Sequence, residues 1–344
     1  MKPSWLKTEP YQDGYYTGIG HSIKDGTNNY VQAAKKSALD DLVSQIKVNV
    51  SSTSVLSFFE VDKQFQEQYE QIIKTTAADE LQEFEMVDAW EDAANYWVYY
   101  RLSIGRYRQI KEEQKRNATL LATDYLKKAR EAEKVNERLQ AIGFYFQAFR
   151  SIEKYLGDAI KVNIDDRDVL LVNEIYASIQ RILDRVHLEV DPTEMALNRR
   201  VAQTQQTVMA KAYYEDLGQV ATDLPLTAAF EKGAGDVYPT YKTDESGHAR
   251  ILLNRIGSSD LEQTLVIKMD VDALSGTSAS PVYNLIAKTL HVPRAQVNMK
   301  VQRPVVYISA EERSLGSMKS SYQISNKLRN LLTNNGFELT NEKG

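Results

Sequence analysis

The chain has 344 residues, 42% of them hydrophobic and 26% charged, which is the composition of a folded protein long enough for several domains. A formal net charge of −5 provides no general attraction for phosphate backbones, so we expect no nucleic-acid partner. The absence of cysteine excludes disulfides, thiol nucleophiles and thiolate metal sites.

The first hundred residues predict an α+β unit. Residues 15–23 have the pattern of a strand, and apolar side chains recur at helical spacing over residues 28–46. A run of β-branched and aromatic residues favours a strand over 48–61, and a polar helix is expected over 64–75. The stretch LQEFEMVDAWEDAANYWVYYRLSI predicts two strands around a turn at residues 92–95.

The glycine-rich stretch GYYTGIGHS poses a choice between a phosphate-binding loop and a strand. A dinucleotide-binding loop needs G-x-G-x-x-G, but Gly20 is followed next only by Gly26, and neither GKS nor GKT occurs. Even spacing places Gly14, Gly18 and Gly20 on one face of a strand. We therefore expect another element, such as the helix over 28–46, to lie close against all three glycines.

Residues 107–186 predict three helices, with breaks near Asn136, Gly157 and Asp165. The middle helix, LQAIGFYFQAFRSIEKYL, carries one apolar stripe suited to packing against its neighbours. The acidic run of Asp165, Asp166 and Asp168 does not match the calcium loop of an EF-hand. We ascribe it to the start of the third helix, where carboxylates cap the backbone and complement the helix dipole.

After Pro192 the chain consists of short apolar runs separated by turn residues, a pattern typical of a β-sandwich. A small helix, PVYNLIAKTL, interrupts these strands before the last one, AQVNMKVQ. The final residues predict a strand in PVVYISAEE, an amphipathic helix over 322–334 that stops at Gly336, and a strand in FELT. About 40 residues of β-α-β structure rarely close a core alone. We expect this unit to dock on the sandwich or to be completed by chain beyond it.

The sequence contains none of the catalytic motifs considered below. The histidines are scattered along the chain without HExxH or a similar spacing, and G-x-S-x-G does not occur. A hydrolase would require His21 or His248 to meet a serine and a carboxylate in a pocket. We expect no catalytic residue, no metal site and no cofactor, and hence a protein that is not an enzyme.

The aromatic hairpin WEDAANYWVYYRL supplies the candidate contact residues. Alternation along a strand places Tyr96, Val98 and Tyr100 on one face and three other side chains on the opposite face: Trp97, Tyr99 and Arg101. One face should belong to the core. The other is either a surface for a partner or ligand, because tyrosine and tryptophan are enriched at interfaces, or a second face covered by helices and neighbouring domains.

Four stretches follow one another along the chain between residues 2 and 106: PSWL, GYYTGIGHS, AAKKSALDDLVSQIKVNVSS and VDAWEDAANYWVYYRL. Together they resemble the LPP-type domain of bacterial outer-membrane lipoproteins. The resemblance implies a glycine-bearing strand, an alanine-rich helix and a closing aromatic hairpin that assemble with other proteins. It also implies a periplasmic protein anchored to the outer membrane through a lipidated cysteine after a signal peptide, neither of which lies in this chain.

Two further resemblances extend this expectation along the chain. LPLTAAFEKGAGDVYPTYKTDESGHARILL is similar to bacterial immunoglobulin-like modules, whose T-D-x-x-G-x-A turn is matched from Thr243 to Ala249. VVYISAEERSLG with ISNKLRNLLTNNGFEL resembles the start of the TolB amino-terminal and CsgG-like fold. We predict a multidomain α+β protein with four parts. Residues 1–106 form a lipoprotein-type domain and residues 107–188 a three-helix segment. Residues 189–303 form an immunoglobulin-like β-sandwich with an inserted helix, and residues 304–344 a partial α/β unit.

These features predict a non-enzymatic scaffold or adaptor of the bacterial envelope, serving a larger secretion, motility or export assembly. Its partners would be other envelope proteins or further copies of the chain, with membrane contact only through the implied anchor. The alternative is a module that binds peptidoglycan, another glycan or some other ligand on the aromatic hairpin over residues 90–101, with Trp97, Tyr99 and Arg101 as contacts.

Overall fold

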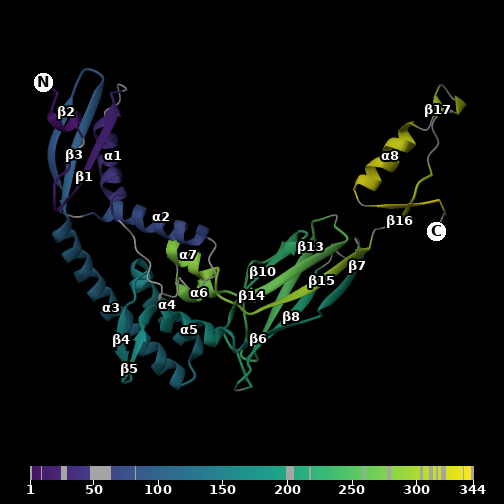
Figure 1. Ribbon diagram of the computed structural model, residues 1–344. Helices are drawn as coiled ribbons and strands as arrows, with labels where there is room; N and C mark the ends of the chain where they lie inside the picture. Colours follow the sequence, from purple (N-terminus) through teal and green to yellow (C-terminus); the bar gives the residue numbers. More distant parts are fainter. Residues whose placement is uncertain are drawn as a thin grey trace. The chain divides into compact units, whose positions relative to one another are not determined.

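A computed structural model of the chain gives the fold shown in Figure 1. It describes residues 2–8, 10–24, 29–46, 63–81, 83–198, 205–216, 218–258, 260–276, 280–302, 305–309, 313–314, 317–318, 323–335 and 337–341. Contacts divide the chain into two compact units, unit 1 (Met1–Gln180 with Ser275–Leu290) and unit 2 (Arg181–Leu274 with His291–Gly344). Helices and several separate sheets confirm the multidomain α+β class. The boundaries of the four predicted domains stay a prediction.

Unit 1 begins with a short 3-10 helix, η1 (Ser4–Leu6), and a three-stranded antiparallel sheet in the order β1-β3-β2. Its strands are β1 (Tyr15–Ile23), β2 (Glu85–Glu91) and β3 (Asn95–Ser103), so the predicted strand and hairpin are confirmed. Helix α1 (Tyr30–Ser44) covers one face of the sheet (Figure 1). The predicted polar helix is α2 (Lys63–Glu80), whereas the strand expected over 48–61 lies outside the described residues.

Helix α1 packs on the sheet through small and apolar residues at helical spacing. Ala34, Ala38 and Leu42 are each 0% exposed and meet Val98 and Leu102 of β3 in one core. The stripe thus buries its alanines where the strand backbone comes close, as the spacing over residues 28–46 predicts.

Close packing against glycine is confirmed at two of the three predicted positions. A Cβ atom on Gly18 would lie 2.2 Å from the Ala38 carbonyl oxygen, and one on Gly20 would lie 1.9 Å from that of Ala34. Both approaches are shorter than any side chain permits, so the backbones meet there because no Cβ intervenes. The prediction is wrong for Gly14, which has φ +78° in the turn before β1 and has open space around it. Gly14 is needed for its positive φ and not for close packing.

Side chains of α1 and of its C-cap residue, Gln45, also satisfy the open edge of β1. Asp41 accepts a hydrogen bond from the Ile19 amide (2.8 Å). The Gln45 amide accepts from the Thr17 N–H (3.3 Å) and donates to the Thr17 carbonyl (2.6 Å). Strand β1 therefore has polar partners along an edge where another strand could otherwise add.

Three helices follow the sheet, as predicted: α3 (Ile104–Lys134), α4 (Arg138–Ile152) and α5 (Leu171–Leu183). Helices α3 and α4 pack against each other across the break at Asn136, which has φ +64°. The expected apolar stripe of α4 is confirmed by buried Ile142, Phe146, Phe149 and Ile152. A 3-10 turn, η3 (Glu153–Tyr155), extends this helix.

The acidic run lies in a β-hairpin and does not open the third helix. Strands β4 (Lys161–Ile164) and β5 (Arg167–Leu170) pair around Asp165 and Asp166, whose φ values are +51° and +60°. Two consecutive residues at positive φ are typical of a type I′ hairpin turn, which aspartate tolerates better than most residues. The third residue of the run, Asp168, lies in β5 and accepts a hydrogen bond from Asn163 (2.9 Å).

The predicted small helix is α7 (Pro281–Ala287), which follows α6 (Val271–Ser275). Although its sequence lies among sandwich strands, its contacts with α2 and η3 place it in unit 1. Figure 1 shows α7 beside α2. Ser280 caps the helix and donates a hydrogen bond to Glu153 (2.6 Å), and Tyr283 meets Phe146 edge to face.

Unit 2 contains the predicted β-sandwich. One sheet has the order β12-β10-β14-β15-β7, built from β12 (Thr240–Lys242), β10 (Pro225–Lys232), β14 (Glu262–Met269), β15 (Arg294–Gln302) and β7 (Glu194–Asn198). The other has the order β11-β13-β8-β6, built from β11 (Gly235–Val237), β13 (His248–Ile256), β8 (Gln206–Tyr214) and β6 (Val186–Asp191), with β9 (Gln219–Val220) on β8. Buried and exposed residues alternate along the long strands, so each sheet turns one face inward.

The last part of unit 2 is the predicted β-α-β element. Strands β16 (Val305–Tyr307) and β19 (Glu338–Thr340) pair in parallel, with α8 (Gln323–Asn334) between them in the chain. A two-residue pair, β17 (Arg313–Ser314) with β18 (Ser317–Met318), precedes the helix. Gly336, the expected helix stop, lies outside the described residues.

Candidate functional site

The hairpin residues predicted as contacts lie on the face of the three-stranded sheet opposite α1. Tyr99 is only 6% exposed and its ring centroid is 5.6 Å from that of Trp5. The Trp97 ring lies between the rings of His21 and Trp90. Its centroid is 4.9 Å from that of His21 and 5.1 Å from that of Trp90.

The third of these residues, Arg101, is also bound within the chain. Its guanidinium group forms an ion pair with Glu85 (2.9 Å), donates to Gln12 (3.3 Å) and lies 4.9 Å from the centre of the Tyr15 ring. Together with Trp5, these contacts show that the amino-terminal residues cover part of this face. A role of Trp97, Tyr99 and Arg101 in binding a partner stays a prediction.

The opposite face of the strand belongs to the core. Val98 is fully buried and Tyr100 is 6% exposed, as the alternation predicts. Burial raises the pKa of Tyr100, so its hydroxyl stays protonated at neutral pH.

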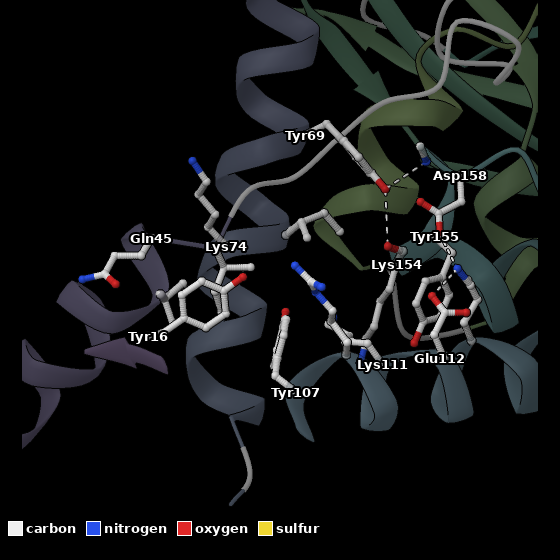
Figure 2. Close-up of a pocket in the computed structure, with 16 residues that line it drawn as sticks. Tyr16, Gln45, Tyr69, Lys74, Tyr107, Lys111, Glu112, Lys154, Tyr155 and Asp158 are labelled. Carbon is white, nitrogen blue, oxygen red and sulfur yellow. Dashed lines mark hydrogen bonds and ion pairs between the residues drawn. The ribbon is translucent and has the colours of Figure 1, made fainter. Parts of the chain in front are cut away.

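A larger hollow lies within unit 1, and sequence reasoning did not find it. This cavity has a volume of about 570 Å³ and is lined by four segments (Figure 2): β1 with the end of α1, helix α2, the first turns of α3, and the residues around η3. Its side chains are mainly tyrosine and lysine. We call it the tyrosine–lysine pocket.

Tyr69 attaches α2 to the far wall of this pocket. Its side chain is 1% exposed, and its hydroxyl accepts a hydrogen bond from the Gly157 N–H (3.3 Å) and donates to the Lys154 carbonyl (3.5 Å), as Figure 2 shows. Burial is the largest cause of a raised Tyr69 pKa, so the hydroxyl remains a donor. One buried hydroxyl thus joins two segments separated by more than eighty residues.

The first turns of α3 supply one wall. Ser103 caps the helix by accepting from the Arg106 amide (3.4 Å). A spacing of four then sets Tyr107, Lys111 and Lys115 on one face of the helix, which is the face that lines the pocket.

Lys111 lies between two aromatic rings of the pocket. Its ammonium nitrogen is 5.9 Å from the centre of the Tyr107 ring and 5.9 Å from that of Tyr155. Both distances are within the range of a cation–π contact, so the rings hold the charge in the cavity wall. Burial raises the pKa of Tyr107 to about 12, with the neighbouring Tyr16 and Tyr155 adding to the effect.

Lys115 binds both acidic side chains of the pocket. Its ammonium group is 2.8 Å from Glu112 and 3.3 Å from Asp158. The hydrogen bond to Glu112 is the main cause of a raised Lys115 pKa, which keeps this ammonium charged. The carboxylates therefore face a cation that is already in the lining.

The carboxy-terminal element exposes a second kind of surface. Along α8, Ile324 is 66% exposed, Leu328 39% and Leu331 59%, and their spacing places them on one face. Val305 and Tyr307 of β16 are also exposed, at 61% and 41%. We call the three α8 side chains the α8 stripe.

The residues considered for hydrolysis do meet, but in an exposed turn. His248 Nδ1 is 3.0 Å from Ser246 Oγ, and Ser246 Oγ donates to Asp244 (2.6 Å). Asp244 also accepts from the amides of Ser246 and His248. The hydrogen bond from the Ser246 hydroxyl is the main cause of a lowered Asp244 pKa, and the two amides add to it. In a catalytic triad the carboxylate orients the imidazole, whereas here it organises the turn.

The described residues contain neither a cluster suited to a metal ion nor a helix suited to spanning a membrane. Within the ranges given above, no three histidine, aspartate or glutamate side chains gather as a metal-binding group. No helix in the described part of the chain has both the length and the apolar character to cross a membrane. The predictions that the protein needs no metal and no cofactor, and that it is not an enzyme, stay predictions.

Comparisons with known proteins give only distant likenesses. No family model matches the chain, and no curated protein matches it. Among solved structures, the C. elegans MSP family member WR4 is 15% identical with a TM-score of 0.22, over 33% of this chain and 97% of that one. The D00-D0 domain of intimin is 18% identical with a TM-score of 0.19, over 27% of this chain and 41% of that one. The ZirS carboxy-terminal domain is 11% identical with a TM-score of 0.22, over 35% of this chain and 66% of that one. TM-scores this low carry no conclusion about function.

Proposed function

We propose that the protein is a non-enzymatic scaffold of the bacterial envelope that assembles with further copies of itself. The exposed α8 stripe carries this proposal. Apolar side chains that recur along one helix face and remain in solvent are a common sign of a protein interaction site. Covering them would remove three large aliphatic groups from water, each worth roughly 1–2 kcal/mol when burial is complete.

Charge favours a second copy as the occupant of the stripe. Helix α8 contains Lys327 and Arg329 and no acidic residue, whereas the whole chain has a formal net charge of −5. Two α8 helices facing each other would bring like charges together. A head-to-tail contact with an acidic surface of the next copy avoids that cost and can continue into a larger assembly.

Strand β2 offers such an acidic surface with apolar residues in it. Met86 is 57% exposed and Val87 43%, beside Glu85, Asp88 and Glu91. The strand lies at the edge of its sheet and is interrupted by a bulge between Met86 and Asp88. A bulged and charged edge resists pairing with another strand, so the contact we propose is made by side chains.

The resemblance of residues 2–106 to LPP-type domains supports the cellular setting of this proposal. We propose a periplasmic location, an outer-membrane anchor outside this chain, and other envelope proteins as further partners. These features follow from the resemblance alone. The self-association can be tested with the present chain.

The test is the molar mass of the chain in solution from about 1 to 200 μM, the range in which weak specific association appears. We expect the mass to rise with concentration. The α8 variant Ile324→Gln, Leu328→Gln, Leu331→Gln and the β2 variant Met86→Thr, Val87→Thr should each be monomeric. Both sets keep the local helix or strand preference, so loss of mass would report the contact.

A mixture of the two variants tests most directly whether the α8 stripe of one copy contacts β2 of another. The α8 variant keeps an intact β2 and the β2 variant keeps an intact stripe, so together they should form a one-to-one complex. Leu120→Gln with Leu121→Gln is the matched control, because these α3 side chains are exposed (65% and 50%) and outside both surfaces. A parent chain that stays monomeric throughout, or a control as damaging as the α8 variant, would refute the proposal.

A further inference from the structure

The tyrosine–lysine pocket carries an excess of positive charge in a chain that is acidic overall. Among its lining residues are five cations, Lys74, Arg108, Lys111, Lys115 and Lys154, and two carboxylates, Glu112 and Asp158. Both carboxylates bind the same lysine, Lys115. The described lining residues therefore carry three more positive than negative charges, against a formal net charge of −5 for the chain.

The cations enter the pocket from separate elements. Lys74 belongs to α2, Arg108 and Lys111 to α3, and Lys154 to η3, and all four line the same cavity. Figure 2 labels Lys74, Lys111 and Lys154 among the lining residues. Like charges drawn together in a concave site raise the local potential and attract anions. A small anion that enters the pocket would therefore meet a favourable potential.

Tyrosine provides the remaining polar groups of the lining. Four tyrosines surround the cavity: Tyr16, Tyr69, Tyr107 and Tyr155. The Tyr69 hydroxyl already donates to the Lys154 carbonyl, whereas a protonated hydroxyl such as that of Tyr107 can donate to a phosphate or carboxylate oxygen. A tyrosine ring also offers a flat face to the C–H groups of a sugar. The pocket thus combines donors for charged oxygens with apolar faces for the frame that carries them.

We infer that the tyrosine–lysine pocket binds a small polyanion with phosphate or carboxylate groups on a sugar-sized frame. A volume of about 570 Å³ is within the range of small-molecule sites and would hold such a molecule with part of its hydration. Lys111, held between the Tyr107 and Tyr155 rings, provides the central contact, and Arg108 supplies a planar group suited to two oxygens of one phosphate. The inference concerns unit 1 alone, so it stands or falls independently of assembly through α8.

The experiment is calorimetric titration of the full chain with three probes. Fructose 1,6-bisphosphate tests the phosphate form, glucarate tests the carboxylate form, and glucose is the neutral control. We expect saturable binding of at least one anion, weakened by added salt, and no binding of glucose. Absence of binding by both anions up to about 10 mM, a concentration at which even weak specific sites fill, would overturn the inference.

Two variants locate the binding. Lys111→Met keeps the aliphatic stem between the rings and removes the charge, and Arg108→Ala changes an exposed residue whose loss leaves the core intact. Each should weaken the anion tenfold or more, the loss typical of one charge-assisted hydrogen bond. Lys127→Ala removes the same charge from an exposed position elsewhere on α3 and should leave affinity unchanged. Equal weakening by Lys127→Ala, or none by either pocket variant, would show that the anion binds by net charge alone.

Discussion

Helices α1 and α8 both carry an apolar stripe beside a small sheet, but only one of them buries it. On α1 the residues Ala34, Ala38 and Leu42 are all 0% exposed. On α8 the equivalent spacing holds Ile324, Leu328 and Leu331, which are 66%, 39% and 59% exposed. Amphipathic spacing therefore identifies a face that can be buried, and the opposing surface decides whether the chain buries it itself.

The surface that faces α1 and the surface that faces α8 differ in the small residues that they contain. Glycines in β1 let the α1 backbone approach until no room for a Cβ remains, and the side chains of Asp41 and Gln45 bind amides of the strand edge. Beside α8, the described strands β16 and β19 have three residues each, too few to cover a helix of twelve. The first interface is closed within the chain, and the second leaves apolar side chains in solvent.

The strongest way to break the closed interface is Gly20→Val. Its Cβ would overlap the Ala34 carbonyl and the Ala38 amide, both of them backbone atoms that cannot turn aside. We expect unit 1 to lose at least about 3 kcal/mol of unfolding free energy, the upper end of the range for overpacking. Urea unfolding followed by tryptophan fluorescence measures this, because Trp5, Trp90 and Trp97 all lie in unit 1.

A glycine without close neighbours is the matched control for that substitution. In Gly105→Ala the new Cβ would lie 3.9 Å from its nearest neighbour, Ser103 Oγ, at the start of α3. Alanine is the better helix former, so stability should be unchanged or rise by up to about 1 kcal/mol. If Gly20→Val were as stable as Gly105→Ala, the close approach of α1 to β1 would be wrong.

The next largest effect is expected from Leu42→Ala. Leu42 is 0% exposed in the α1 core, and removing its branched end leaves a cavity that rigid strands cannot fill. Such changes cost about 2–5 kcal/mol in well-packed cores. The same fluorescence measurement reports the loss, and a cost below about 1 kcal/mol would show a loosely packed interface.

The unfolding free energy at alkaline pH tests whether unit 1 also shields its polar groups from solvent. Tyr107 has a pKa of about 12 in the folded protein, against the ordinary value of about 10 in an unfolded chain. Below pH 10 both states keep the proton and stability is full. Between about pH 10 and 12 the unfolded state gives up the proton first, so stability falls as pH rises.

Tyr107→Phe isolates this contribution. The variant has no hydroxyl to ionise at that position, so its unfolding free energy should fall less than that of the parent between about pH 9 and pH 11.5. Lysine titrations in the same range are common to both proteins and cancel in the difference. Parallel losses in parent and variant would place Tyr107 in solvent and not in the pocket wall.

Periodicity predicted much of this fold, because it reflects local geometry. The α1 stripe, the aromatic hairpin, the apolar face of α4 and the alternating sandwich strands all follow from spacing along one element. The prediction that Asp165 and Asp166 open a helix was wrong for a local reason as well, since aspartate favours both helix starts and positive-φ turns.

The pocket could not be predicted in the same way. Its wall joins Tyr16, Tyr69, Tyr107 and Lys154, which belong to four segments that periodicity treats separately. A visible signal did exist in the spacing of Tyr107, Lys111 and Lys115, which indicates one polar helix face, but nothing in the sequence says what that face meets. Likewise, α7 lies among sandwich strands in the sequence while its contacts belong to unit 1, which only tertiary structure reveals.

The smallest expected effect is that of Leu331→Ala in the α8 stripe. This side chain is 59% exposed, so truncation removes little buried surface and leaves no enclosed cavity. Alanine also favours the helix, and the stability of the isolated chain should change by less than about 0.5 kcal/mol. Hydrogen exchange of the peptide over residues 323–334 in dilute solution measures this, since the tryptophans report only unit 1. If exchange there accelerated as much as it does around α1 in Leu42→Ala, the α8 stripe would already be buried within the chain, and the difference between the two helices would be one of degree.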